Sequence, residues 1–201
     1  MKKIKAIQQH QRKVKERLFD PTVCSIQGSL FLPAQVQKVF QGKNLLQEDK
    51  DYLTIPGLVL NNEISRAWGI SLAAWKEYKN ETSRGDLEEE EKLKITKNFA
   101  RLLFKEALGY ELESANSYEE NGSSFVLDWM ANGSYPISVS SASYSQDTRQ
   151  SRFVTVQSLA GKSVFQNIQE LVNSSSKFTW GLSFNGETVR LVRDSISLSS
   201  P

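Results

Sequence analysis

The sequence predicts an α+β protein, with helices in its first half and a mixed β-sheet in its second. Apolar residues recur at helical spacing between residues 61 and 108, but they alternate with polar residues in short runs after residue 120. Near its end the chain carries an Asn-Gly pair, Asn185-Gly186, between two alternating apolar runs, which is typical of a tight β-hairpin. With 201 residues and 39% hydrophobic content, the chain can bury a core.

The first half reads as a helical lobe. Residues 2–18 are basic with a thin apolar stripe, which predicts a helix that either packs lightly on the body or contacts DNA. A second helix is expected at 34–40. A third begins near residue 61 and places Trp68 and Trp75 on one face. Aromatic residues at helical spacing are more often core than a base-stacking platform, so we expect both to be buried.

The second half predicts the order helix, three strands, helix, hairpin. The helix spans about 88–108, where an acidic first turn complements the helix dipole and Gly109 suits a left-handed end. Strands are expected at 125–129, 135–143 and 152–159, followed by a helix at 163–172 and the hairpin at 177–194. The expected organisation is a helical lobe at 1–80, a polar linker at 81–87 and a core at 88–201.

Composition excludes several classes of protein. Lys and Arg number 25 against 23 Asp and Glu, so the net charge of +2 favours nucleic acid only weakly. A single cysteine, Cys24, excludes an internal disulfide framework, and with the single histidine, His10, it provides no zinc-ligand spacing. No apolar stretch reaches the length of a secretory signal or a membrane span, so we expect a cytoplasmic protein without membrane contact.

Several blocks of sequence carry a family resemblance. In the hairpin they are Trp180-Gly181-Leu182, Asn185-Gly186 and Arg190-Leu191. Further blocks are Tyr52-Leu53, Pro56-Gly57, Ile64, Arg66-Ala67-Trp68, Trp75, Tyr78, the run 103–110, Tyr135-Pro136-Ile137 and the ending at 193–198. In this order they resemble the amino-terminal region of long type IIG-like adenine-specific DNA methyltransferases, which occur as restriction-modification enzymes and in phage-defence systems of the DISARM and BREX kind.

The resemblance implies a restriction-nuclease-like fold, a degenerate PD-(D/E)xK core. It also implies that the chain is an amino-terminal piece of a longer enzyme, with DNA engaged through that parent protein and with defence-system subunits as possible partners. The parent would use S-adenosylmethionine. This chain contains neither the Asn-Pro-Pro-Tyr/Phe element that grips an extruded adenine nor a glycine-containing cofactor loop, so no cofactor is expected for it.

A nuclease of this family needs a carboxylate on the second strand and a Glu-x-Lys or Asp-x-Lys on the third, because two acids hold Mg²⁺ while the lysine orients water. These slots align with Pro136-Ile137 and with residues 157–159, and neither provides an acid. We therefore predict a noncatalytic domain without a metal, with vestigial candidates at Glu106, Asp128, Gln157 and Lys162. The alternative is a Mg²⁺-dependent endonuclease that uses Asp128, Glu106 and Lys162 in an atypical arrangement.

Candidate DNA contacts are basic residues, and each is equally compatible with an ordinary solvated surface. They are Lys2, Lys3, Lys5, Arg12, Lys13, Lys15 and Arg17 near the start, and Arg149, Arg152 and Lys162 around the sheet. A further alternative is a protein-interaction module without DNA binding, which would dock through exposed aromatic residues such as Trp129, Tyr144 or Phe178.

Overall fold

The computed structural model describes residues 25, 27, 28, 30–48, 52, 59–153 and 161–194. The chain divides into two compact units, Met1–Pro56 and Gly57–Pro201. The described part of the first unit contains the helix α1 (Pro33–Phe40), in which no residue is buried. Its first residue is a proline, which suits this position because its missing N–H would have no partner within the helix. The helix expected at 34–40 is thus confirmed.

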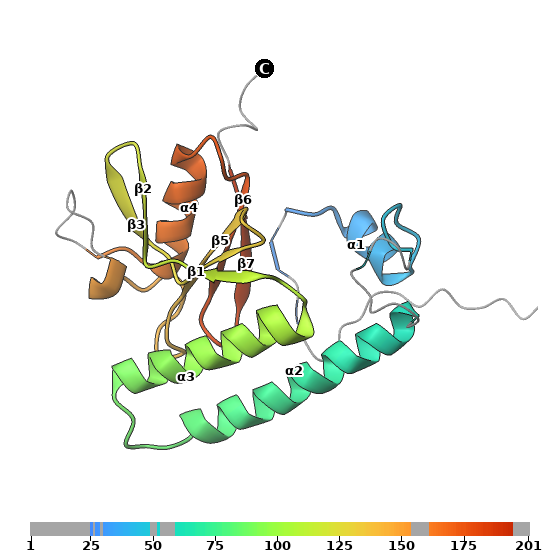
Figure 1. Ribbon diagram of the computed structural model, residues 1–201, viewed down its shortest axis with the longest axis horizontal. Coiled ribbons are helices and arrows are strands. Elements are labelled where there is room, and N and C mark those ends of the chain that lie inside the picture. The colour runs from blue at the N-terminus through green and yellow to red at the C-terminus, as the bar shows by residue number, and fades with distance from the viewer. Residues whose placement is uncertain are drawn as a thin grey trace, which may run out of the picture. The chain divides into compact units, whose positions relative to one another are not determined.

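The second unit has helices on both faces of a mixed sheet, which confirms the α+β prediction (Figure 1). Its helices are α2 (Leu60–Thr82), α3 (Glu89–Arg101), the π-helical segment η2 (Leu102–Ala107), the 3-10 helix η3 (Ser151–Phe153) and α4 (Val164–Ser174). Its strands are β1 (Leu112–Ser114), β2 (Ser117–Glu120), β3 (Ser123–Val126), β4 (Trp129–Ala131), β5 (Tyr135–Val139), β6 (Trp180–Phe184) and β7 (Val189–Arg193). The expected linker at 81–87 lies within this unit and includes most of the connection from α2 to α3.

The main sheet has five strands in the order β1-β4-β5-β6-β7. Neighbouring strands run antiparallel except β5 and β6, which are parallel. Parallel neighbours need a crossover, and α4 provides it between β5 and β6. The strands β2 and β3 form a separate hairpin inserted between β1 and β4.

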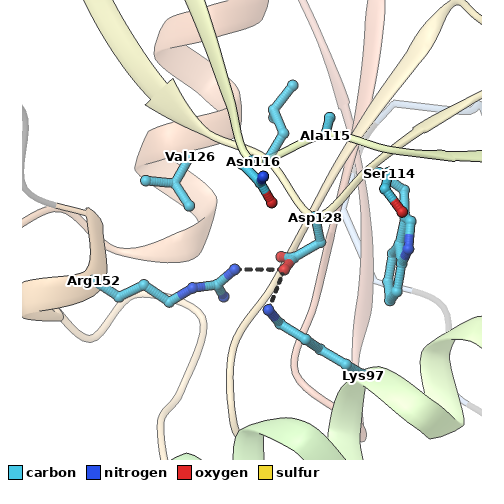
Figure 2. A pocket seen from close by; sticks show the side chains of 9 residues that line it. Lys97, Ser114, Ala115, Asn116, Val126, Asp128 and Arg152 are labelled. Atoms are coloured by element: carbon cyan, nitrogen blue, oxygen red, sulfur yellow. Dashed lines mark hydrogen bonds and ion pairs between the residues drawn. The ribbon is translucent and has the colours of Figure 1, made fainter.

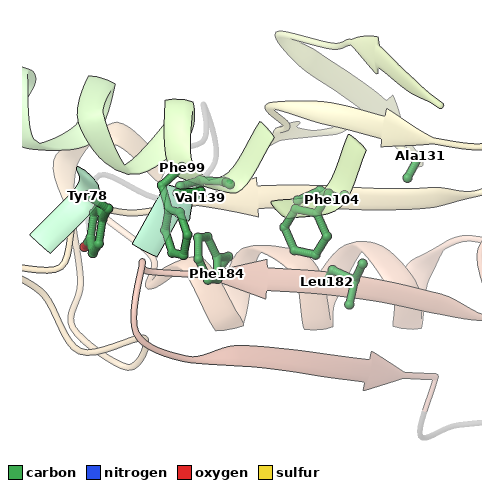
Figure 3. Packing of buried hydrophobic residues seen from close by; sticks show 10 residues of the cluster. Tyr78, Phe99, Phe104, Ala131, Val139, Leu182 and Phe184 are labelled. Carbon is green, nitrogen blue, oxygen red and sulfur yellow. The ribbon is translucent and has the colours of Figure 1, made fainter. Parts of the chain in front are cut away.

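The face of the sheet that α3 covers is packed with aromatic rings (Figure 3). Phe99 of α3 stacks on Tyr78 of α2 with ring centroids 4.7 Å apart, and Phe104 of η2 meets Phe184 of β6 edge-on at 5.7 Å. Each such pair contributes about 0.5–1.5 kcal/mol beyond the burial of its area. Because Tyr78 belongs to this cluster, both α2 and α3 pack against this face of the sheet.

The transition from α3 to η2 widens the helix by one residue in its final turn. The backbone N–H of Leu108 donates to the carbonyl of Leu103, five residues earlier, at 3.0 Å. Arg66 of α2 donates to the backbone carbonyl of Glu106 at 3.1 Å and so satisfies an acceptor in this turn. Gly109 then takes a positive φ of 75°, which confirms the expected left-handed end of the helix.

The opposite face is covered by α4, whose start is fixed by a reciprocal cap between Ser163 and Gln166. Ile168 and Val172 of α4 approach the sheet so closely that a Cβ at Gly181 would lie 2.7 Å and 3.0 Å from their methyl groups. Only glycine fits at that point of β6 without moving the helix.

The expected burial of both tryptophans on α2 is only half right. Trp75 packs against the aromatic cluster, but Trp68 is 50% exposed. The inward side of α2 carries Ala67, Ala74 and Tyr78, and Trp68 is turned one position away from it. Ile64 and Leu72 share the outward side, so an apolar stripe stays exposed on the first half of α2.

Two expected strands differ from the structure. The run 125–129 is broken at Leu127 and Asp128, because its first part pairs within the β2–β3 hairpin and its last part starts β4. The strand expected at 152–159 begins instead as the 3-10 helix η3, and residues 154–160 lie outside the described residues.

The closing hairpin is confirmed, with a longer loop than the Asn-Gly pair predicts. The last pair of the ladder is Phe184 with Val189, which leaves a four-residue loop between them. Only Gly186 takes a positive φ, 89°. The side-chain oxygen of Asn185 instead accepts the backbone N–H of Glu187 at 3.3 Å, which forms an Asx turn, and that of Thr188 at 2.9 Å.

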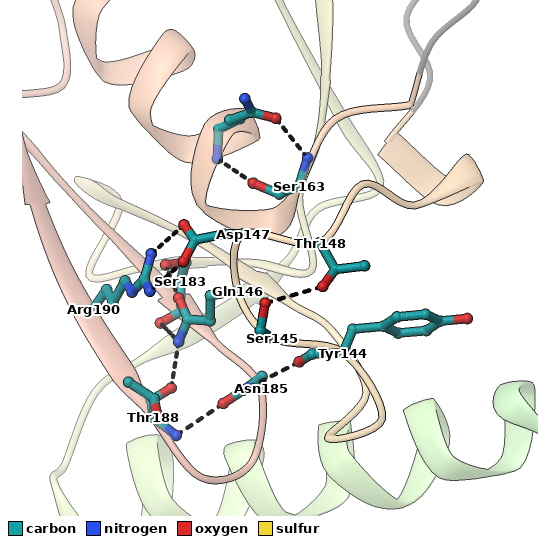
Figure 4. Close-up of polar contacts among 11 residues, drawn as sticks. Tyr144, Ser145, Gln146, Asp147, Thr148, Ser163, Ser183, Asn185, Thr188 and Arg190 are labelled. Atoms are coloured by element: carbon teal, nitrogen blue, oxygen red, sulfur yellow. Dashed lines mark hydrogen bonds and ion pairs between the residues drawn. The ribbon is translucent and has the colours of Figure 1, made fainter.

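A polar network ties the loop after β5 to this hairpin (Figure 4). Buried Gln146 donates to the carbonyl of Thr188 at 2.6 Å and accepts the hydroxyl of Ser183 at 2.5 Å. Arg190 and Asp147 form two parallel bonds of 2.7 Å each. We refer to Tyr144, Gln146, Asp147, Ser183, Asn185, Thr188 and Arg190 as the hairpin network.

Candidate functional site

The candidate site is built around Asp128, which lies between β3 and the first residue of β4. Its backbone is held on both sides: its N–H donates to the carbonyl of Ile137 at 2.9 Å, and its carbonyl accepts the N–H of Ala115 at 3.2 Å. Its side chain is only 3% exposed, and one carboxylate oxygen accepts the backbone N–H of Val139 at 2.7 Å. A buried carboxylate is stable only with such partners.

Two cations meet at the other carboxylate oxygen (Figure 2). Lys97 extends from α3 and places its Nζ 2.7 Å from Oδ1 of Asp128. Arg152 reaches across from η3, where the fully buried Phe153 anchors the segment, and donates both to Oδ1 and to the backbone carbonyl of Val139. Three separate segments of the chain therefore converge on one carboxylate.

The cluster carries more positive than negative charge. One carboxylate faces two cations, so its formal charge is +1. Whereas Asp128 is buried, the side chains of Lys97 and Arg152 are 35% and 22% exposed. They line a pocket of about 350 Å³, together with exposed Ser114 and Asn116. We call this the cation pocket. Positive groups thus reach solvent while the acid lies beneath them.

The residues of the cation pocket do not fit a divalent metal ion. Mg²⁺ in nucleic-acid enzymes is held by carboxylate oxygens, usually more than one, with substrate phosphates and water. Among the described residues that line the pocket, Asp128 is the one acid, and its oxygens already accept from Lys97, Arg152 and Val139. Within the described ranges, no three His, Cys, Asp or Glu side chains gather into a possible metal site.

The structure gives the other catalytic candidates different partners. Glu106 lies in η2, where its backbone carbonyl accepts from Arg66. Lys162 forms an ion pair with Glu170 of α4. Neither contacts Asp128 in the described structure, so the atypical triad is not assembled. Gln157 lies outside the described residues, as do residues 158 and 159 of the expected Glu-x-Lys slot.

The expected acid slot at Pro136-Ile137 falls in the middle of β5, where Ile137 is fully buried in the aromatic cluster. In chain order the main sheet contains β1 and β4 before β5, so β5 is its third strand and not the second strand that the alignment assumed.

The structure places the predicted DNA-binding residues in different environments. Arg152 lies in the cation pocket, and Arg149 is exposed on the connection before η3. Those near the start of the chain lie outside the described residues: Lys2, Lys3, Lys5, Arg12, Lys13, Lys15 and Arg17.

Lys97 was not predicted as a site residue, although one feature of the sequence points to it. It lies four residues after Leu93 and three before the fully buried Ala100, so it interrupts the inward side of α3 with a charge.

The aromatic residues expected to dock a partner are less exposed than predicted. Phe178 is 2% exposed and packs edge-on against Tyr118, because it belongs to the core beneath α4. Trp129 and Tyr144 are half-buried.

No protein-family model, curated protein or solved structure matches this chain. Among the helices that the structure describes, none combines the length and apolar character needed to cross a membrane.

Proposed function

We propose that this chain is a noncatalytic, nuclease-like domain of a restriction-modification or phage-defence DNA adenine methyltransferase, and that it assists the engagement of DNA. The order of elements supports the nuclease-like fold. One helix, α3, precedes three strands of the main sheet, β1, β4 and β5, and the second helix, α4, leads into the hairpin of β6 and β7. The β2–β3 hairpin is an insertion in that order.

The single observation that carries the proposal is the saturation of Asp128 by Lys97 and Arg152. Asp128 immediately precedes the second strand of the main sheet, where the family places its first metal-binding acid, and it accepts from Val139 on the third. The described third strand, β5, contains no acid. An arginine and a lysine thus bind the carboxylate oxygen that a metal ion would need as a ligand. The site therefore favours binding of an anion over metal-dependent hydrolysis.

The proposed engagement of DNA would work by neutralising phosphate charges. Binding through lysine and arginine releases counterions from DNA, so the affinity should fall steeply as salt rises. Of the basic candidates, Arg152 is held in place by the fold, together with Lys97, and Arg149 is exposed three residues before Arg152. S-adenosylmethionine belongs to the proposed parent enzyme and has no role in this domain.

The test is the binding of a labelled DNA duplex to the 201-residue chain at about 50 mM and about 200 mM salt, with and without Mg²⁺, and with the products run on a denaturing gel. We expect a shift that weakens with salt, no cleavage and no effect of Mg²⁺. Cleavage in the Mg²⁺ arm that Asp128→Asn abolishes would establish the endonuclease alternative. Absence of binding at the lower salt would overturn the proposal.

A second candidate function, contact with another subunit, is favoured by the exposed stripe of Ile64, Trp68 and Leu72 on α2. Large apolar side chains grouped on one helix face are typical of protein interfaces. If this function holds, Trp68→Glu lowers the affinity for the parent enzyme's remaining domains and leaves DNA binding unchanged.

A further inference from the structure

We propose that the cation pocket binds a phosphodiester group of a DNA strand without a metal ion. This inference rests on the proposed function and deepens it, because it assigns the DNA contact to Lys97 and Arg152. The contact would lie at the start of β4, between α3 and η3.

The hydrogen-bond donors of the pocket are only partly used. A guanidinium has five N–H donors in a fixed fork, and the described contacts of Arg152 engage one terminal nitrogen with Val139 and the other with Asp128. An ammonium has three donors, and Lys97 directs one toward Asp128. The described contacts do not engage the other donors of these two partly exposed side chains, and such donors can bind phosphate oxygens. Arginine is especially suited to this because its fork matches two oxygens at once.

Asp128 fixes the position of the two cations. Alone, a lysine and an arginine this close would repel each other, and their long side chains would lose conformational entropy on becoming ordered. The buried carboxylate holds both, and the backbone contacts of Asp128 to Ile137 and Ala115 hold the carboxylate. The pocket is therefore preorganised, so that phosphate binding requires little additional ordering of these side chains.

The charge of the cluster selects the class of ligand. Its formal charge of +1 equals the single negative charge of a phosphodiester in size. The polar side chains on the rim, Ser114 and Asn116, are neutral and can donate to the same oxygens. Figure 2 shows the Asn116 amide on the same opening as Asp128 and Arg152. A backbone phosphate contact of this kind fixes the position of the DNA but reads no sequence.

The experiment measures duplex affinity for wild type, Lys97→Ala, Arg152→Gln and Asp128→Asn as a function of salt. We expect the first two variants to bind about tenfold more weakly, with a salt slope lowered by about one. We expect Asp128→Asn to bind more tightly, by about tenfold, because the amide oxygen can still accept from Lys97 and Arg152 while the negative charge that opposes a phosphate is gone. The matched control is Lys94→Ala, which removes the same charge from an exposed position of α3 outside the pocket and should change affinity by less than about twofold.

Asp128→Asn separates a binding role from a structural one, because a purely structural cluster would lose function when any member is replaced. Thermal unfolding of each variant shows whether it is folded, and if Arg152→Gln fails to fold, Lys97→Ala and Asp128→Asn still decide the question. Wild-type binding that none of these substitutions alters would overturn the inference and leave the proposed function standing.

If wild type does not bind duplex at low salt, the proposed function fails and the pocket is tested directly. Dimethyl phosphate, a phosphodiester without bases or sugars, is titrated into ¹⁵N-labelled protein. Shifts at the Asn116 and Arg152 side chains that Lys97→Ala removes would support the pocket. The absence of such shifts would overturn it.

Discussion

The cation pocket and the hairpin network contain the same kinds of polar groups but differ in the ratio of cations to carboxylates. In the hairpin network Asp147 pairs with Arg190 one to one, through two bonds of 2.7 Å. Gln146 uses both its oxygen and its nitrogen on groups of the β6–β7 hairpin. In the cation pocket, by contrast, one carboxylate faces two cations, and these remain partly exposed.

This difference separates a polar group that completes a fold from one that is available to a ligand. Burial of a polar group is tolerated when its partners match it, and the hairpin network meets that condition. Donors at an opening can be satisfied by water, so they remain available to a ligand. The comparison therefore predicts that substitutions in the hairpin network change stability and leave anion binding unchanged, whereas substitutions in the cation pocket change both.

The largest loss of stability is expected for Gln146→Leu. Leucine has a similar size, but it leaves the fully buried hydroxyl of Ser183 without its acceptor and removes one donor from each of the Ser183 and Thr188 carbonyls. Unsatisfied buried groups of this kind cost about 3 kcal/mol together. Urea unfolding measures the change.

The control for this prediction is the double variant Gln146→Leu with Ser183→Ala. Because it removes both partners of the buried bond, it should recover part of the loss. A double variant less stable than the sum of the two single changes would show that the bond itself does not set the cost. DNA affinity should be the same in all three proteins.

A smaller loss is expected for Asp128→Ala, about 2 kcal/mol, because Val139 loses the acceptor of its N–H while water can still solvate parts of Lys97 and Arg152. The two cations then repel each other, so added salt should restore part of the stability. Urea unfolding at low and high salt measures this. Equal salt responses of Asp128→Ala and Gln146→Leu would break the comparison between the two regions.

The smallest effect is expected for Arg190→Ala, about 0.5 kcal/mol, because both members of its pair are substantially exposed to solvent. The Arg190 hydrogen bonds lower the pKa of Asp147 below its ordinary 3.8. A lowered pKa stabilises the fold above the unfolded value and loses that contribution as pH falls through the folded value. The difference between wild type and Arg190→Ala should therefore be present at pH 7 and vanish in acid below the lowered pKa. A difference that persists there would contradict the pairing.

Much of the second unit was predictable from local pattern. The helices at α2, α3 and α4 and the closing hairpin follow from apolar spacing, and Gly109 ends its helix as expected. The sequence did not predict the strands β1, β2 and β3 with their observed bounds, because each has only three or four residues. Such short strands are set by their cross-strand partners more than by their own sequence. β1, for example, pairs with β4, across the inserted hairpin.

The candidate site was predictable only in part. Asp128 and Arg152 were both singled out from the sequence, but for different roles, one catalytic and one DNA-binding. Their meeting depends on tertiary structure, since Lys97, Asp128 and Arg152 come from a helix, the start of a strand and a 3-10 turn. No local periodicity relates positions so far apart. The strand order expected from the sequence lacked β1, so the alignment counted β5 as the second strand of the sheet and not as the third.

The π-helical turn η2 has a consequence for how this helix can change over time. A wide turn of this kind corresponds to one inserted residue that the helix absorbs without breaking. Upstream of it, Lys97 and Phe99 keep their directions toward the pocket and the core. Within it, Phe104 meets Phe184. A change of one residue in the length of this turn can therefore be absorbed without rotating Lys97 away from Asp128.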